Sequence, residues 1–309
     1  MQKISIVTPC YNEEENIAAL YDSIREIILK FPEYDYEHIF IDNCSTDNSQ
    51  QILRAIANKD TRVKVILNAR NFGHIRSPYH GIIQASGDAV ICLACDFQDP
   101  PDLINQLITK WQEGAKIVLA IKTKSHESRL LYGIRTAYYR LASHLSDVSL
   151  NENHTGFGLY DKQVIEILRK IEDPYPYFRG LISEIGFAPV KIPFTQPIRL
   201  RGITKNNFYI LYDMAMLGIT KHSKVPLRLA TMSGFALSLL SLLTGLAYLI
   251  YKLLYWERFS AGMAPVVIGL FLFCSVQLFF IGILGEYIGV ILTHVRKLPL
   301  VVEKERINF

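Results

Sequence analysis

Carboxylate and amide side chains gather in four short clusters, each directly after an apolar stretch in the first third of the chain. The clusters are residues 9–13 (PCYNE), 42–47 (DNCSTD), 68–74 (NARNFGH) and 96–101 (DFQDPP). The chain has no Gly-x-x-x-x-Gly-Lys-Ser/Thr, which excludes a P-loop, and no Gly-x-Gly-x-x-Gly after the first apolar stretch, which argues against a dinucleotide fold. Carboxylates without a glycine loop are typical of a site where a divalent cation binds phosphates.

Alternating strand and helix signals predict the elements that position these clusters. The apolar stretches predict strands at 4–8, 38–41, 63–67, 89–93 and 117–120. The helix periodicity and breaker residues predict helices at 17–28, 47–58, 101–113 and 127–147. Apolar strands separated by helices indicate an α/β fold with a parallel sheet covered on both faces. In such sheets ligands bind beyond the carboxyl ends of the strands, where all four clusters fall.

Two apolar runs near the end of the chain are long enough to cross a membrane. They cover residues 229–251 and 264–292, and each exceeds the roughly 20 residues that a bilayer requires. Basic residues flank the pair on its outer sides, so the positive-inside rule predicts a multi-pass protein of the inner (plasma) membrane with both termini in the cytoplasm. Gly285 and Gly289 have a spacing that permits assembly into a homo-oligomer. Glu286 between them is interpreted as a functional group or as a partner of a nearby basic residue.

Composition agrees with a folded domain attached to a membrane. Half of the 309 residues (50%) are hydrophobic and 20% are charged, which excludes disorder. The net charge of +4 is too small to indicate binding to nucleic acid, so no nucleic acid partner is predicted. We divide the chain into an α/β domain at 1–200, a basic and amphipathic juxtamembrane segment at 201–227, two transmembrane helices within 228–293, and a cytosolic tail at 294–309.

Taken in order, the clusters resemble the motifs of a known family. The chain is similar to inverting GT-A glycosyltransferases, specifically the polyprenyl-phosphate glycosyltransferases related to dolichyl-phosphate mannose synthase, in the bacterial branch with two C-terminal transmembrane helices. The matching stretches are 7–17, 41–47, 70–74, 85–89 and 96–101. The resemblance covers nearly the whole chain and implies a GT-A domain, Rossmann-like with a mostly parallel sheet, that is catalytic and cytosolic.

The resemblance implies that a nucleotide sugar lies over the ends of the first two strands. Pro9, Tyr11 and Glu13 would hold the ribose and base, and Asp42 the uracil edge. Cys44 stands where the family usually has a glycine. We place further residues at the nucleotide-sugar site, namely Asn12, Asn43 (where the family has a second acid), Asn71, Cys95, Gln98 and Lys122 (which matches a family arginine near the phosphates). The alternative for 42–47 is a turn followed by a helix N-cap, because Ser, Thr and Asp favour both.

The expected metal site departs from the family pattern. Where the family commonly has Asp-x-Asp, this chain has Ala-Cys-Asp, so Asp96 is the one carboxylate left to bind Mg²⁺ or Mn²⁺. One carboxylate suffices, because proteins hold Mg²⁺ with one or two carboxylates together with substrate phosphates and water. Asp99, followed by Pro100, is interpreted as a helix start. Cys92 and Cys95 would face opposite sides of a strand, which disfavours a redox or zinc pair.

Basic residues upstream of the first apolar run indicate the acceptor side of the reaction. The segment 199–205 (RLRGITK) resembles a family segment that binds phosphates. The resemblance implies that Arg201 and Lys205 bind the donor diphosphate or the lipid phosphate, and we group both with Asp96 as catalytic residues. The alternative is a basic patch attracted to anionic lipids.

No carboxylate stands where the family often has a catalytic base. That position is Gly156, and the neighbouring family arginine is replaced by Gly158. A sugar hydroxyl needs a positioned base in order to attack. A phosphomonoester is already nucleophilic at neutral pH, because its second pKa is about 6. The missing Asp therefore favours a phosphate acceptor, although Glu152, His154 and Asp161 are titratable groups nearby.

Together these features predict a membrane glycosyltransferase. It would move a hexose, in particular glucose, from a UDP-sugar to polyprenyl phosphate with inversion, for cell-surface glycan modification such as cell-wall or O-antigen glycosylation. Its partners would be a nucleotide sugar, the polyprenyl phosphate lipid and the membrane. Three alternatives stay open: a transferase with another lipid or glycan acceptor, a catalytically degenerate membrane scaffold, and a sensor that binds a sugar nucleotide.

Overall fold

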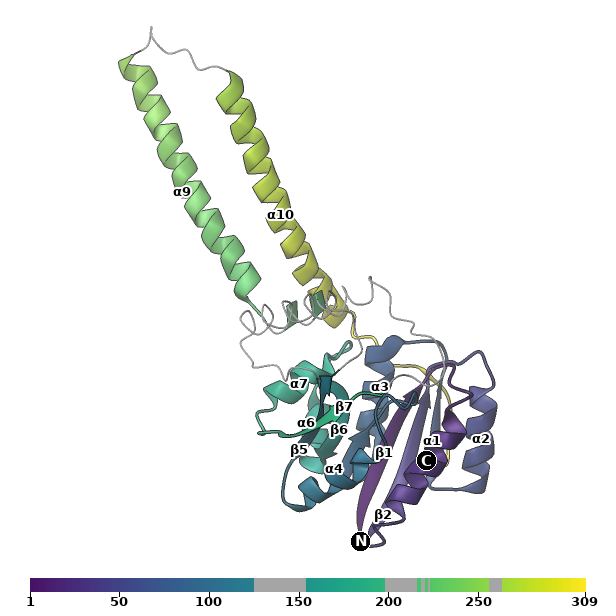
Figure 1. Cartoon of the computed structure of the whole chain (residues 1–309). Helices are drawn as coiled ribbons and strands as arrows, with labels where there is room; N and C mark the ends of the chain where they lie inside the picture. Colours follow the sequence, from purple (N-terminus) through teal and green to yellow (C-terminus); the bar gives the residue numbers. More distant parts are fainter. Residues whose placement is uncertain (125–153, 198–215, 218–219, 222, 256–262) are drawn as a thin grey trace.

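The structure is a computed structural model that describes residues 1–124, 154–197, 216–217, 220–221, 223–255 and 263–309. These residues form an α/β domain and two long helices that leave the domain on the same side (Figure 1). The helix predicted at 127–147 lies outside the described residues.

A mixed, mostly parallel sheet forms the centre of the domain. It has 8 strands in the order β7-β5-β6-β4-β1-β2-β3-β8. Neighbours pair in parallel except at β6, which is antiparallel to β4 and β5, and at β8, which is antiparallel to β3. The strands are β1 (Gln2–Cys10), β2 (Tyr34–Asp42), β3 (Val63–Asn68), β4 (Ala89–Cys92), β5 (Ile117–Lys124), β6 (His154–Asp161), β7 (Val190–Thr195) and β8 (Glu303–Ile307). This topology confirms the predicted α/β, GT-A-like fold class.

Helices cover both faces of the sheet and bury a hydrophobic core on each. α1, α2 and α4 contribute to one core, and α3, α6 and α7 contribute to the other. The apolar side chains that predicted α1 are its buried ones, from Ile17 to Ile28, so the periodicity of 3.6 residues marks the face that meets the sheet. The domain helices are α1 (Ile17–Ile28), α2 (Ser49–Lys59), α3 (Gly73–Gln84), α4 (Leu103–Gln112), α6 (Lys162–Lys170) and α7 (Phe178–Glu184).

The helix α3 was not predicted, because two of its residues have low helix propensity. Pro78 and Gly81 both lie inside it. The glycine is needed for packing, since a Cβ atom at position 81 would lie 3.0 Å from the Cγ1 atom of Val7 and 3.1 Å from the Cγ2 atom of Ile41. Close approach to β1 and β2 therefore outweighs local propensity in this helix.

Two helices follow the domain and are long and apolar enough to cross a membrane. They are α9 (Val225–Leu254) and α10 (Met263–Val295), which run in opposite directions (Figure 1). At their domain ends the phenol of Tyr287 donates a hydrogen bond to the carbonyl of Ser223 at 2.6 Å. A Cβ atom at Gly285 or Gly289 would meet nothing within 4 Å, so these glycines leave open space within one chain.

The end of the chain returns from α10 to the domain and adds a strand to the sheet. Val65 of β3 pairs with Ile307 of β8. Arg54 forms an ion pair with Glu305, and the side-chain amide of Asn308 donates to the carbonyls of Ala57 and Val63 at 2.8 and 2.9 Å. The segment expected as a tail at 294–309 thus contributes to the sheet that begins with the first residues of the chain.

Candidate active site

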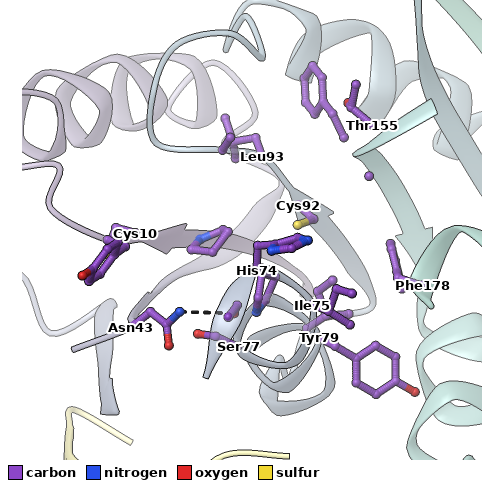
Figure 2. Close-up of a pocket in the computed structure, with 18 of the residues that line it drawn as sticks. Cys10, Asn43, His74, Ile75, Ser77, Tyr79, Cys92, Leu93, Thr155 and Phe178 are labelled. Carbon is purple, nitrogen blue, oxygen red and sulfur yellow. Dashed lines mark hydrogen bonds between the residues drawn. The ribbon is translucent and has the colours of Figure 1, made fainter. Parts of the chain in front are cut away.

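A cavity of about 610 Å³ opens at the carboxyl ends of β1 and β4. These strand ends face the side of the domain from which α9 and α10 leave (Figure 1). Cys10 and Asn43 lie on one side of the cavity, and Thr155 and Phe178 lie on the other (Figure 2). All four predicted clusters contribute lining residues, since the cavity is also bordered by Pro9, Tyr11, Asn71, Asp96 and Asp99.

Amide hydrogen bonds join the second and third clusters beneath the cavity. The side-chain amide of Asn43 donates to the Oδ1 atom of Asn71 at 2.9 Å. The Oδ1 atom of Asn43 accepts a hydrogen bond from the backbone N–H of Phe72 at 2.8 Å. Asn43 also reaches the carbonyl of Gly73 at 3.2 Å. A second acid at this position would lack the donor that makes two of these bonds, so asparagine suits this arrangement better than the family's usual acid.

The first and second clusters are joined by a second set of hydrogen bonds. The backbone N–H of Asn12 donates to the Ser45 hydroxyl at 2.8 Å, and its side chain accepts from the Thr46 N–H at 2.8 Å. Asp42 is buried, and its carboxylate accepts from Ser45 and from the side chain of Gln50 at 2.9 Å. The carboxylate of Asp42 therefore holds the turn that follows β2.

The turn after β2 places Cys44 in a backbone conformation that favours glycine. Its φ angle is 64°, in the left-handed region. Most side chains meet the backbone unfavourably there, at a cost of roughly 1–2 kcal/mol. A glycine, which the family resemblance implies at this position, would adopt this conformation without that cost.

Two carboxyl groups of the fourth cluster line the cavity. Asp96 accepts a hydrogen bond from the N–H of Gln98 at 3.1 Å, and Asp99 accepts one from the N–H of Ala94 at 2.9 Å. The interpretation of Asp99 as a helix start was wrong, because α4 begins at Leu103 and Asp99 points back to the end of β4. Burial, together with the charge of Asp96, raises the pKa of the Asp99 carboxyl to about 7, against the opposing effects of the Ala94 hydrogen bond and Arg179.

The donor set at Asp96 fits a shared cation better than an all-protein metal site. Among the described residues no three His, Cys, Asp or Glu side chains converge to hold a metal ion. Mg²⁺ needs only one or two carboxylates when a diphosphate supplies other oxygens. The repulsion between Asp96 and Asp99 would also fall if a cation neutralised it, so these residues suit a divalent ion bound together with a phosphorylated substrate.

Two cysteines, Cys92 and Cys95, lie near the end of β4. Cys92 lines the cavity, and burial raises the pKa of its thiol to about 12. Cys95 lies in the hydrophobic core and does not line the cavity. Both are free thiols, and Cys95 lies beyond the end of β4 at Cys92, so the two do not share one strand as the sequence reasoning assumed.

Of the far wall of the cavity, the sequence pointed to the stretch around Gly156 but not to residues 176–179. This wall consists of residues 155–157 at the start of β6 and residues 176–179 at the start of α7. Arg179 and the aromatic side chains of Tyr177 and Phe178 lie in this wall. The signal in the sequence for residues 176–179 is the run PYPYFRG at 174–180, in which prolines and aromatic residues precede one arginine.

An ion pair ties this wall to the segment that leads into α9. The ammonium of Lys221 lies 2.6 Å from Oδ2 of Asp173 and 2.5 Å from the carbonyl of Tyr175. Both charged side chains are only 9% exposed. Asp173 also accepts from the N–H of Tyr175 at 2.9 Å. The position of the wall at 176–179 is thus coupled to the segment that leads into α9.

A small second cavity lies at the same junction. It has a volume of about 220 Å³ and is bordered by Lys221, Glu286 and His294. His294 approaches Asp173 at 3.7 Å. Glu286, singled out in the sequence, thus lies beside a basic residue of the juxtamembrane segment.

The structure separates the predicted site residues into three groups. Those that line the cavity are Pro9, Tyr11, Asn43, Asn71 and Asp96. Those that lie outside its lining are Asn12, Glu13, Asp42, Cys95, Gln98 and Lys122. The catalytic residues predicted from the basic segment, Arg201 and Lys205, lie outside the described residues, as does Glu152.

Two glycines, Gly156 and Gly158, lie in the region where the family often has a catalytic base, and packing requires the glycine at 158. A Cβ atom at Gly158 would lie 2.5 Å from the carbonyl of Val118, so β5 and β6 approach too closely for any side chain. Gly156 lines the cavity with a φ of 105° and nothing within 4 Å of a Cβ position. Asp161 accepts from the Gln163 N–H at 3.0 Å and caps α6. None of these three residues supplies a base at the cavity.

His154 is also unsuited to act as a base. It is 2% exposed and does not line the cavity. Burial and the charge of Arg179 lower the pKa of its imidazole to about 3. Its Nε2 atom lies 3.2 Å from the Tyr160 hydroxyl. The imidazole is therefore a neutral part of the interior.

The fold and the arrangement of the site are those of a GT-A glycosyltransferase, and sequence comparison gives the family. The model of glycosyl transferase family 2 matches residues 5–169, which include β1 to β6 and the residues at their ends. The chain belongs to glycosyl transferase family 2 and is related over its full length to bactoprenol glucosyl transferases.

Two relatives illustrate this similarity. An uncharacterized glycosyltransferase of Bacillus subtilis (strain 168), YkcC, is 34% identical over 301 residues, covering 96% of this chain and 91% of the relative. The SfII prophage-derived bactoprenol glucosyl transferase of Shigella flexneri is 34% identical over 304 residues, covering 98% of both chains. Among solved structures, glucosyl-3-phosphoglycerate synthase from Mycobacterium tuberculosis aligns with a TM-score of 0.49 and 22% identity, over 71% of this chain and 76% of that one.

Proposed function

We propose that this protein transfers a hexose, in particular glucose, from a UDP-sugar to polyprenyl phosphate with inversion at the anomeric carbon. The observation that carries the proposal is the position of Asp96 in a cavity whose far wall is tied to the segment that leads into the first of two membrane-length helices. A relative that matches 98% of the chain is named for the glucosylation of bactoprenol. The positive-inside pattern supports a cytoplasmic domain at the inner membrane, where product would serve cell-surface glycans.

Different residues of the cavity are proposed to bind different parts of the donor. Tyr11 and Asn43 border the side where the first two parallel strands end, which suits the nucleoside. Asp96, with Asp99 behind it, would hold Mg²⁺ or Mn²⁺ at the diphosphate. When bound, such an ion neutralises the charge that develops on the leaving UDP. Arg201 and Lys205, from the basic segment, are proposed to bind phosphate on the acceptor side.

The chemistry of the cavity favours a phosphate acceptor over a hydroxyl acceptor. His154 has an imidazole whose pKa is about 3, and Asp161 caps α6. Asp99 is the other carboxyl at the cavity besides Asp96 among the described residues, and we propose that it shares with Asp96 in holding the cation, which occupies it and leaves no free base there. A phosphate dianion needs no base, so it can attack the anomeric carbon from the face opposite the leaving UDP, which inverts the configuration.

The test is sugar transfer by the full chain in detergent. Labelled UDP-glucose, polyprenyl phosphate and Mn²⁺ are expected to give labelled lipid, with the β anomer formed from the α-linked donor. Asp96→Ala should lower the rate on the order of 100-fold or more, because it removes the carboxylate that places the cation. Asp102→Ala is the matched control, since Asp102 is exposed and makes no cap hydrogen bond to α4.

The same assay separates the alternatives. If the label enters a neutral lipid or a glycan instead of polyprenyl phosphate, that molecule is the acceptor and the proposed acceptor is wrong. If the protein binds UDP-glucose but transfers glucose to no lipid, the proposed enzymatic function is wrong and a scaffold or a sensor is the better interpretation. A panel of UDP-sugars in place of UDP-glucose identifies the hexose.

A further inference from the structure

One cation in the cavity wall has no role in the function as proposed so far. Arg179, in the first turn of α7, lines the cavity together with Asp96 and Asp99. Among the ion pairs that join described residues, none includes Arg179. A guanidinium in a partly buried wall is costly unless an anion meets it there.

The electrostatic effects of Arg179 show that it acts on the interior of the cavity. Its positive charge lowers the pKa of the Asp99 carboxyl and of the His154 imidazole, although burial dominates both values. Asp99 would be an anionic partner only when ionised, and burial keeps the pKa of that carboxyl near 7. A bound dianion would therefore be a stronger partner for Arg179 than the acid already present.

The place of Arg179 in the fold distinguishes between the two phosphates of the reaction. The donor is proposed to lie where β1 and β2 end, on the side of Cys10 and Asn43, whereas Phe178 lies on the opposite side (Figure 2). The wall at 176–179 directly follows Tyr175, whose carbonyl accepts from Lys221 at the foot of α9. Arg179 is therefore on the side from which a membrane lipid would enter.

The neighbours of Arg179 suit the chain of such a lipid. Pro176, Tyr177 and Phe178 line the cavity beside it, and Tyr79 faces them from α3 with its ring 6.2 Å from that of Phe178. An apolar and aromatic wall with one guanidinium matches a molecule that has a phosphate head and a hydrocarbon tail. Arginine also offers two parallel N–H donors to a phosphate, which lysine does not.

We propose that Arg179 binds the phosphate of the lipid acceptor, while the aromatic wall at 176–178 contacts its first isoprenoid units. This inference rests on the proposed function, because it names the residue that holds that acceptor. It makes Arg179 a substrate-binding residue in addition to Arg201 and Lys205.

The inference is tested by binding as well as by turnover. We would measure the dissociation constants of a short-chain polyprenyl phosphate and of the matching polyprenol for the full chain in detergent. The ratio of the two constants gives the discrimination that is due to the phosphate alone. Arg179→Gln should reduce this discrimination about 10- to 100-fold and raise the KM for polyprenyl phosphate by the same factor. Arg179→Lys should fall between it and the wild type, since it keeps the charge and loses the paired donors.

Two controls separate this effect from misfolding and from loss of charge. Affinity for UDP in the presence of Mn²⁺ should stay within about twofold of wild type in both variants, which shows that the domain is folded. Lys170→Gln, an exposed change of the same charge at the end of α6, should leave lipid discrimination unchanged. Inorganic phosphate should compete with polyprenyl phosphate weakly, because it lacks the chain that the aromatic wall contacts.

The outcomes distinguish this inference from the proposed function. Unchanged lipid discrimination in Arg179→Gln, or a loss of UDP affinity with lipid binding intact, overturns the inference and leaves the proposed transfer standing. Phosphate discrimination that depends on Arg179 in a protein that transfers no sugar supports the inference and overturns the transfer. A wild type that binds polyprenol as tightly as polyprenyl phosphate overturns the inference directly.

Discussion

At the scale of single residues, Cys44 is a strained position in a turn that borders the site. Its φ of 64° is one that glycine adopts without cost. Cys44→Gly should therefore raise the free energy of unfolding by about 1 kcal/mol. Cys44→Ala keeps the strained Cβ atom and removes only the thiol, so it is the matched control. Thermal melts of the two variants in one detergent measure the difference, and equal melting temperatures would show that the turn is not strained.

The sequence predicted the near side of the cavity well and the far side poorly. Asn43, Asn71 and Asp96 were found because each follows an apolar strand, and strand ends are where ligands bind in such sheets. Arg179 was missed because it belongs to a short helix whose place beside β6 depends on tertiary contacts. Asp99 was interpreted as a helix start because an Asp before Pro is typical of helix N-termini. In the structure its carboxyl is buried and accepts a hydrogen bond from the N–H of Ala94 instead.

At the scale of elements, the interior of β2 carries a histidine that makes stability depend on pH. His38 is 1% exposed, and its Nε2 atom lies 3.0 Å from the Thr8 hydroxyl of β1. Burial lowers the pKa of this imidazole to about 3, from an ordinary value of 6.5. The unfolded chain thus binds a proton that the folded one excludes, and stability is lost as the pH falls below about 6.5.

Replacement of this histidine should flatten the acid side of the stability profile. His38 contributes a slope of up to about 1.4 kcal/mol per pH unit between pH 6 and 4, and His38→Gln removes it. Melting temperatures at pH 8, 6 and 5 measure the effect, with the interval above pH 7 as internal control because both proteins are uncharged at this position there. A variant as acid-sensitive as the wild type would show that the imidazole is protonated in the fold.

Helices and strands could be predicted where a local sequence pattern marks them. They could not be predicted where contacts with a neighbouring element determine the structure. The five strands from β1 to β5 and the helix α1 were expected, because apolar runs and a 3.6-residue period mark them. The strands β6 and β7 were not expected. Gly156 and Gly158 weaken the strand signal of β6, and the second of these is required by the close approach of Val118 in β5.

At the scale of the whole molecule, β8 joins the end of the chain to β3, at the edge of the sheet. Removal of residues 301–309 deletes this strand, the ion pair of Arg54 and the hydrogen bonds of Asn308 to α2 and β3. We expect a melting temperature lower by several degrees and aggregation through the exposed edge of β3. Glu305→Gln in the full chain is the control and should have little effect, because exposed ion pairs contribute little. A truncated protein as stable and monodisperse as the full chain would show that β8 is dispensable.

The position of β8 after both long helices has a consequence for how the protein is made. Val65 is translated early, yet its partner Ile307 leaves the ribosome only after α9 and α10 have been synthesised. The outer edge of β3 therefore has no β8 partner until both helices, each long and apolar enough to cross a membrane, have been made. A nascent chain that stalls before Glu303 would present this edge as an open strand, which is a template for pairing with other chains.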